Sequence, residues 1–141
     1  MILNVSLTTV YCLDQDQTRD FYVDKLGFEP RDDATIGDFR WVTVGHPSQP
    51  ELELTLMKPG PPLSPEAADF IRGQLESGGL GGIGLRVDDC KKTYEELKAK
   101  GVTFLQEPVD RPYGVEAVIR DNTGNWLSLV EPKPYRPSDL G

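Results

Sequence analysis

Hydrophobic and polar positions alternate in several short stretches of the chain, a pattern typical of half-buried β-strands. This alternation, with enrichment in Val, Ile and Thr, predicts strands at residues 3–12, 28–32, 40–45, 51–57, 83–87, 103–106, 114–120 and 126–131. Helical spacing and capping residues predict helices from Asp14 or Asp16 to Leu26, from Pro65 to about Leu75, and from Asp88-Asp89 to Lys100. The order of elements is therefore βαβββ, an intervening helix, and βαβββ again.

The two halves of the chain are an internal duplication. A shift of about 74 residues places Asp14 on Asp88 and Gly27 on Gly101, and each pair brackets a helix. A four-stranded sheet of this kind has free edges and one uncovered face, which a second sheet can help to bury. We therefore expect an α+β fold in which two tandem βαβββ modules form a curved mixed sheet around a cleft.

The length of 141 residues predicts a single domain. Module one spans about 3–57, a linker with a short helix about 58–80, module two about 81–131, and a tail 132–141. Glycines at 78, 79, 81 and 82 lack the Gly-Lys-Ser/Thr ending of a phosphate loop, so we interpret this cluster as slack between the modules.

Charge and cysteine content narrow the classes of partner and the compartment. The chain has 15 basic and 23 acidic residues and a formal charge of -8, which argues against nucleic acid or a membrane as partner and favours cationic ligands. Two cysteines are too few for a disulfide framework, and the sequence shows neither a leader pattern nor a membrane-spanning apolar stretch. These features predict a cytoplasmic protein.

Several motifs together resemble the vicinal oxygen chelate superfamily, which includes glyoxalase I, extradiol dioxygenases, fosfomycin-modifying enzymes and bleomycin-binding resistance proteins. The resemblance covers about residues 3–131. It is carried by Asp14-Gln15-Asp16, Phe21-Tyr22, Lys25-Leu26-Gly27-Phe28, Val87-Asp88-Asp89 and Asp121-Asn122-Thr123-Gly124-Asn125-Trp126. These are helix and turn residues, so they indicate the fold more strongly than the chemistry.

The resemblance also implies where metal ligands would stand, namely on the first and last strand of each module. Those positions hold Leu7 and Glu53 in module one, and Gly81 or Gly82 and Ser128 in module two. One carboxylate among four positions is fewer than the three protein ligands that a catalytic metal usually needs. We therefore expect no metal and no cofactor.

Alternation along the strands predicts which residues would line the cleft. The candidates mix aromatic and apolar surfaces with a few polar groups, which suits a small organic ligand with flat or hydrophobic parts, aromatic or cationic. The candidate ligand-binding residues are Leu7, Thr9, Tyr11, Trp41, Glu53, Thr55, Arg86, Tyr113, Trp126 and Ser128. The orientation of Trp41, Arg86 and Tyr113 depends on strand register, because a shift of one residue turns each to the other face.

Other chemistry-bearing residues have simpler interpretations. His46, the only histidine, lies in a predicted hairpin loop and is interpreted as solvated. Cys12 and Cys90 are interpreted as ordinary cysteines, although Lys91 and Lys92 beside Cys90 could lower a thiol pKa. The acidic pairs at the helix starts are interpreted as caps.

The resulting hypothesis is a metal-independent small-molecule-binding protein, similar to the antibiotic-sequestering resistance proteins, with no catalytic residue. One alternative is a lyase or isomerase-like enzyme that uses Glu53 as a general base or binds metal through residues in another register. A further alternative is a domain whose cleft is filled by its own side chains. The resemblance also implies a homodimer, the commonest closed assembly.

Overall fold

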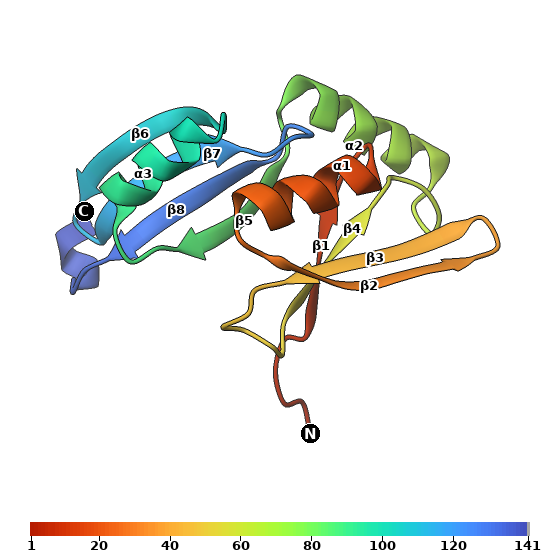
Figure 1. The fold of residues 1–141 in the computed structure, drawn as a ribbon, viewed down its shortest axis with the longest axis horizontal. Coiled ribbons are helices and arrows are strands. Elements are labelled where there is room, and N and C mark those ends of the chain that lie inside the picture. Colours follow the sequence, from red (N-terminus) through yellow and green to blue (C-terminus); the bar gives the residue numbers. More distant parts are fainter. Residues whose placement is uncertain (141) are drawn as a thin grey trace. The chain divides into compact units, whose positions relative to one another are not determined.

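The computed structural model describes residues 1–140 and divides into two compact units, Met1–Ser77 and the chain from Gly78 onward. Each unit contains one four-stranded mixed sheet (Figure 1). The predicted α+β class and the tandem βαβββ order are confirmed. That the two units form one domain around a cleft stays a prediction.

The first unit is built on a sheet of strand order β1-β4-β3-β2, here called sheet A, in which β1 and β4 are parallel and the other neighbours antiparallel. Helix α1 continues directly into a π-helical segment. The elements are β1 (Leu7–Tyr11), α1 (Gln15–Asp20), the π-helical segment (Phe21–Lys25), β2 (Glu29–Ile36), β3 (Phe39–Gly45), β4 (Glu53–Met57) and α2 (Pro65–Ser77).

The second unit repeats this plan in sheet B, with strand order β5-β8-β7-β6 and a parallel β5–β8 pair. Its elements are β5 (Gly81–Arg86), α3 (Cys90–Ala99), β6 (Thr103–Arg111), β7 (Gly114–Arg120), β8 (Trp126–Pro132) and a short 3-10 helix (Pro137–Leu140). Gly141, the last residue of the predicted tail, lies outside the described residues.

The helix ends preserve the duplication. Asp14 caps α1 by accepting the Gln17 N–H at 2.9 Å, and Asp89 caps α3 by accepting the Lys92 N–H at 3.1 Å. The cap of the second helix is thus Asp89, one residue after the position that the shift of 74 predicts. Gly27 and Gly101, which follow the two helices, have φ of 81° and 82°, a backbone conformation that favours glycine.

The core of each unit lies between its sheet and its βαβ helix. In the first unit, Val10, Val42 and Leu56 of sheet A are buried together with Tyr22 of the π-helical segment. In the second unit, sheet residues and α3 residues are likewise buried, among them Ala117, Ile119, Leu127, Leu129, Cys90 and Leu97. The buried hydrophobic residues of the sheets, such as Val42 and Val44 or Leu127 and Leu129, are two apart along each strand, as the period of a strand requires.

Strands β2 and β6, each at one edge of its own sheet, are longer than the sequence pattern predicts. The structure extends β2 to Ile36 and β6 to Arg111, beyond the predicted ends at residues 32 and 106. Pro108 discourages a strand prediction beyond residue 106, and Asp32-Asp33 does so beyond residue 32, because proline and aspartate are depleted in strands. Both β2 and β6 are edge strands, where the missing N–H of a proline need not cost a ladder hydrogen bond.

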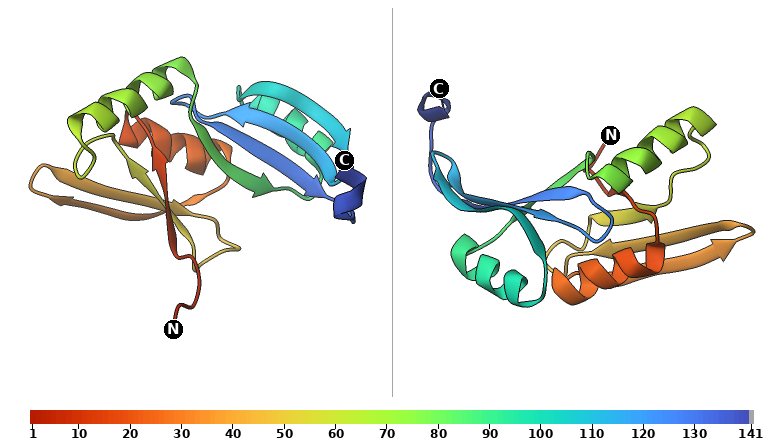
Figure 2. Two further views of the ribbon diagram at one scale, coloured as in Figure 1. Left: turned by 180° about the vertical axis from the view of Figure 1, so that it is seen from behind. Right: turned by 90° about the horizontal axis from the view of Figure 1, so that it is seen from above.

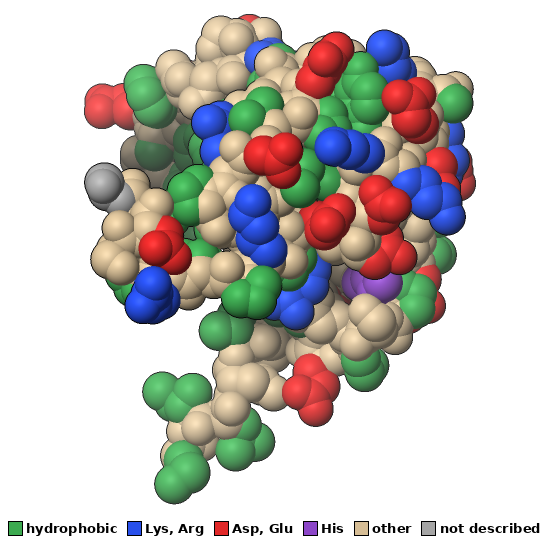
Figure 3. All heavy atoms as spheres, turned by 90° about the vertical axis from the view of Figure 1, so that its left-hand side faces the viewer, with side chains coloured by type: hydrophobic (Ala, Val, Ile, Leu, Met, Phe, Trp, Pro, Cys, Tyr) green, Lys and Arg blue, Asp and Glu red, His purple; other side chains and the backbone are tan. Residues whose placement is uncertain are grey.

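Strand β1 also begins later along the chain than the sequence pattern predicts. Residues 1–6 precede β1 and form no strand, so the strand predicted from residue 3 begins only at Leu7. Their hydrophobic side chains Met1, Ile2, Leu3 and Val5 are exposed, and the end of the chain protrudes in Figure 3. Local β-propensity is high here, but no neighbouring strand is present to pair with this segment.

Within residues 1–140, none of the helices is both long and apolar enough to cross a membrane.

Candidate functional site

The candidate residues of the first unit lie on the face of sheet A opposite α1. The register pairs Leu7 with Glu53 and Thr9 with Thr55, while Val10, which follows Thr9, and Leu54, which lies between Glu53 and Thr55, are buried on the α1 side. The remaining candidates follow by the same alternation: Tyr11, beside Met57, and Trp41, two residues before Thr43.

A row of three threonines crosses this face, because Thr55 pairs with Thr9 on one side and with Thr43 on the other. The Thr43 hydroxyl accepts the Asp32 N–H at 2.9 Å. Thr55 is 2% exposed, and its hydroxyl has no hydrogen-bond partner among the described residues. Part of this face is therefore closed, whereas Leu7 and Thr9 remain exposed.

Helix α2 contributes to the covering of the first unit. In the right-hand view of Figure 2, α1 and α2 lie on opposite sides of sheet A. Ala68 and Leu75, seven residues apart on α2, are both buried, whereas Phe70 is 68% exposed. The helix thus presents one apolar side inward.

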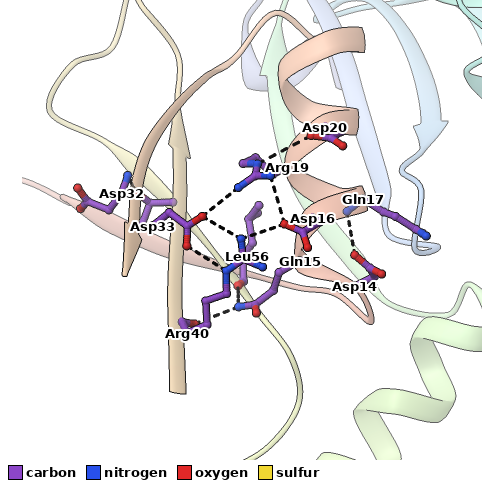
Figure 4. Close-up of polar contacts among 11 residues, drawn as sticks. Asp14, Gln15, Asp16, Gln17, Arg19, Asp20, Asp32, Asp33, Arg40 and Leu56 are labelled. Atoms are coloured by element: carbon purple, nitrogen blue, oxygen red, sulfur yellow. Dashed lines mark hydrogen bonds and ion pairs between the residues drawn. The ribbon is translucent and has the colours of Figure 1, made fainter. Parts of the chain in front are cut away.

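The α1 side of the same sheet is organised by charge instead. Arg40 donates to Asp16 at 2.9 Å and to Asp33 at 2.8 Å, and Arg19 bridges the same two carboxylates at 3.2 and 3.1 Å (Figure 4). Arg40 and Arg19 lower the pKa of both Asp16 and Asp33 below the usual 3.8, chiefly through the hydrogen bond from Arg40. This network connects α1 to β2 and β3 and leaves neither arginine free.

In the second unit, the register places Trp126 and Ser128 on the same face of sheet B, opposite α3. Ser128 pairs with Gly84 and Val118, and Trp126 pairs with Gly81 and Arg120. Leu127 and Leu129, between and after them, are buried on the α3 side. Trp126 is 43% exposed, so its indole is accessible.

The glycine cluster has a definite structural role at this point. Gly81 and Gly82 belong to β5, so the interpretation of the cluster as slack between modules is wrong for them. A Cβ at Gly81 would overlap the Trp126 ring, and a Cβ at Gly78 would overlap the Arg120 guanidinium. The two side chains therefore lie directly against glycine backbone. The sequence pattern did not point to Arg120. The signal that could have identified it is the turn at residues 121–125, which places Arg120 directly opposite Trp126.

Two other candidates of this unit lie along different parts of the sheet. Arg86 is exposed at the end of β5, where it pairs with Val130. Tyr113 lies in the turn between β6 and β7, with its ring 6.4 Å from that of Tyr135, and a hydrogen bond with Glu116 raises its pKa. Tyr113 therefore belongs with Glu116 and not with the Trp126–Ser128 pair.

The side chains at the positions expected for metal ligands do not form a ligand set. Glu53 is half-buried beside Leu7, and Ser128 lies beside Gly84 and Val118; none of these three neighbours has a ligating side chain. Across the 140 described residues, no group of three or more His, Cys, Asp and Glu side chains could hold a metal ion. The residues of this chain therefore do not fit the metal site of the superfamily's enzymes.

The remaining reactive side chains are placed as structural residues. His46 is exposed in the β3–β4 loop, where its Nδ1 accepts the Ser48 N–H at 3.1 Å. Cys12 and Cys90 are buried and form no disulfide within the described residues. Burial, reinforced by Glu131 and nearby carboxylates, raises the pKa of the Cys90 thiol, so the suggested lowering by Lys91 and Lys92 is wrong.

Comparisons with known proteins agree with this fold. The chain is 33% identical over 129 residues to the uncharacterized protein YurT of Bacillus subtilis (strain 168), covering 92% of this chain and 99% of YurT. The crystal structure of UcmS2 matches with a TM-score of 0.85 and 47% identity, covering 93% of this chain and 99% of that one. The crystal structure of TnmS3, an antibiotic binding protein from Streptomyces sp. CB03234, matches with a TM-score of 0.75 and 30% identity, covering 94% and 98%.

The family model of the Glyoxalase/Bleomycin resistance protein/Dioxygenase superfamily matches residues 4–129, nearly the whole of both modules. This agrees with the resemblance in the helix and turn motifs and with the paired βαβββ sheets. The chain belongs to the glyoxalase/bleomycin resistance protein/dioxygenase superfamily.

Proposed function

We propose that this chain is a metal-independent binding protein that sequesters a small, flat organic molecule of the antibiotic type. The observation that carries the proposal is Trp126, an exposed aromatic side chain that rests on glycine backbone beside Ser128. A ring held in this way is ordered before a ligand arrives, which lowers the entropic cost of stacking. The antibiotic binding protein TnmS3, at 30% identity, supports the same class of ligand.

Binding without catalysis is supported by the surroundings of Glu53, the one acidic residue among the candidates. Its cross-strand neighbour on β1 is Leu7, which offers no group to share a proton. Within the described residues of its own unit, Glu53 makes no ion pair. Elemental analysis of the purified protein tests the enzyme alternative, since one tightly bound transition metal per chain would contradict the metal-independent proposal.

The ligand-binding form is proposed to be a cytoplasmic homodimer. Neither cysteine forms a disulfide within residues 1–140, which is compatible with a reducing compartment. Strands β1 and β5 are edge strands of their own sheets and each offers one unpaired side to another strand. Sedimentation equilibrium tests the dimer; a mass that stays at the 15.7 kDa of one chain across micromolar concentrations would contradict it.

Titration of Trp126 variants against a panel of polycyclic antibiotics, neutral and cationic, tests the binding role. Trp126→Ala is expected to weaken binding by about 2 kcal/mol or more, roughly 30-fold in Kd, with Trp126→Phe intermediate. Phe70→Ala removes another exposed aromatic side chain, on α2, and serves as the matched control. Thermal melts accompany each titration.

Equal binding by the parent and both Trp126 variants would assign Trp126 no role in recognition. An unfolded Trp126→Ala together with a folded Trp126→Phe that binds like the parent would identify the residue as part of the core.

A further inference from the structure

Arg120 has guanidinium N–H donors that no acceptor within residues 1–140 occupies. It is half-buried, and within residues 1–140 its guanidinium makes no hydrogen bond or ion pair. Every other half-buried arginine among the described residues forms an ion pair, namely Arg19, Arg31, Arg40, Arg72 and Arg111. In a chain with a formal charge of -8, an unpaired, half-buried arginine is an exception.

The nearest carboxylate in the sequence is already occupied. Asp121 follows Arg120 directly, but its Oδ1 accepts the N–H groups of Thr123, Gly124 and Asn125 at 2.9–3.0 Å, and its Oδ2 accepts from the Asn125 side chain. Asp121 is 5% exposed and serves the turn between β7 and β8. The donors of Arg120 therefore remain available to water or to a ligand.

Arg120 and Trp126 share one location. They pair directly across β7 and β8, so their side chains leave the same face of sheet B from neighbouring positions. The guanidinium lies against Gly78 and the indole against Gly81, along a single glycine-rich segment. A ligand that stacks on Trp126 therefore has guanidinium donors beside it.

The chemistry of this pair specifies what it can recognise. An indole offers a flat apolar surface for stacking, and a guanidinium offers a fixed fork of N–H donors that matches the two oxygens of a carboxylate. A partly desolvated arginine without an acceptor gains more from an anionic oxygen than an exposed one does. A cationic group at the same place would be repelled.

We propose that Arg120 and Trp126 form an anchor for a planar aromatic ligand that carries an anionic oxygen, as in an aromatic carboxylate or phenolate. The proposal rests on the proposed binding function and names the chemical class of its ligand. It differs from what the acidic surface alone suggests, which is a cation. Gly78 and Gly81 act as positioning residues because their missing side chains leave the space that the anchor occupies.

Three probes of matched shape test the anchor: pyrene carboxylate, pyrene methanol and pyrene methylamine, whose side groups are anionic, neutral and cationic. Binding to the full chain is measured by calorimetry. We expect the carboxylate to bind about tenfold or more tightly than the alcohol, and the amine most weakly.

Arg120→Gln is expected to abolish this preference while leaving the alcohol's affinity within about twofold of the parent, since stacking on Trp126 is retained. Arg120→Lys keeps the charge without the fork and is expected to restore only part of the preference. Lys91→Gln removes one positive charge from the exposed side of α3, on the other face of the sheet, and controls for net charge.

The outcomes separate the anchor from the proposed function. A carboxylate preference that disappears in Arg120→Gln and persists in Lys91→Gln supports the anchor. Equal binding of all three probes, or a preference unchanged in Arg120→Gln, overturns the anchor and leaves the binding function standing. If none of the probes binds to the parent or to Arg120→Gln, both proposals are overturned.

Discussion

The last two strands of each module are joined by a connection that a single charged side chain holds, but the charge is opposite in the two modules. In the first, Arg31 donates to the carbonyl oxygens of His46, Pro50 and Leu52 at 3.1 Å and of Gln49 at 3.4 Å. In the second, Asp121 accepts the N–H groups of the turn that follows it.

The difference follows from the backbone that each connection exposes. The longer loop between β3 and β4 directs four carbonyl oxygens at one side chain, so it needs a donor with several N–H groups, and arginine supplies five. The tight turn between β7 and β8 turns consecutive N–H groups inward and needs an acceptor, which a carboxylate supplies. A duplicated module can therefore keep its strand order while the chemistry that closes its loops changes sign.

Among the variants that test this comparison, removal of the Asp121 carboxylate should lower the free energy of unfolding the most. Asp121→Ala leaves three turn N–H groups and the Asn125 amide without their acceptor in a buried position, and we expect a loss of about 3 kcal/mol or more in unfolding free energy. Urea unfolding measures it. Asp121→Asn keeps one acceptor oxygen and should lose about half as much. A parent-like urea midpoint for Asp121→Ala would show that the turn does not depend on the carboxylate.

Removal of the Arg31 guanidinium should have a smaller effect, because its loop is largely exposed and water can replace the donors. We expect Arg31→Met to cost about 2 kcal/mol and to accelerate amide hydrogen exchange in residues 46–52. Arg31→Lys retains the charge but cannot reach four carbonyl oxygens with a planar fork, so it should resemble Arg31→Met. Full retention of stability and protection by Arg31→Lys would mean that charge alone holds the loop.

The modules also differ in how the helix is joined to the outer strands. Module one uses the ion pairs of Arg40 and Arg19 with Asp16 and Asp33. In module two, the Tyr94 ring contacts the Phe104 ring with centroids 4.7 Å apart, and the Tyr94 hydroxyl donates to Glu107 at 3.0 Å. Ion pairs respond to pH and salt, whereas the ring contact between Tyr94 and Phe104 carries no charge.

The smallest effect is therefore expected in a pH series that compares the parent with Arg40→Gln. The pKa values of Asp16 and Asp33 are lowered in the folded state, so the stability they contribute is present above the unfolded value near 3.8 and is lost as pH falls below it. The parent should exceed Arg40→Gln in Tm at neutral pH and low salt. The gap should narrow below pH 4 and in high salt, and a gap constant with pH would refute an ionic origin.

Strand alternation identified from the sequence which residues share a face, because side chains on a strand alternate with a period of two whatever the strand packs against. It correctly grouped Leu7 with Thr9, and Trp126 with Ser128. Helix caps and stops were equally local: Gly27 and Gly101 were identified directly, and the first cap was narrowed to Asp14 or Asp16, of which the structure shows Asp14. The binding roles of the grouped residues stay predictions.

Other features depended on contacts between distant segments. The pairing that allows Pro30 and Pro108 inside edge strands is set by strand order, which no local window contains. The roles of Gly78 and Gly81 appear only once Arg120 and Trp126 lie against them. The sequence by itself thus determined the elements, their duplication and the absence of a full ligand set at the expected metal positions. Only the tertiary structure decided that Arg120 is left unpaired beside an exposed tryptophan, because burial and pairing are properties of neighbours that the chain brings together from afar.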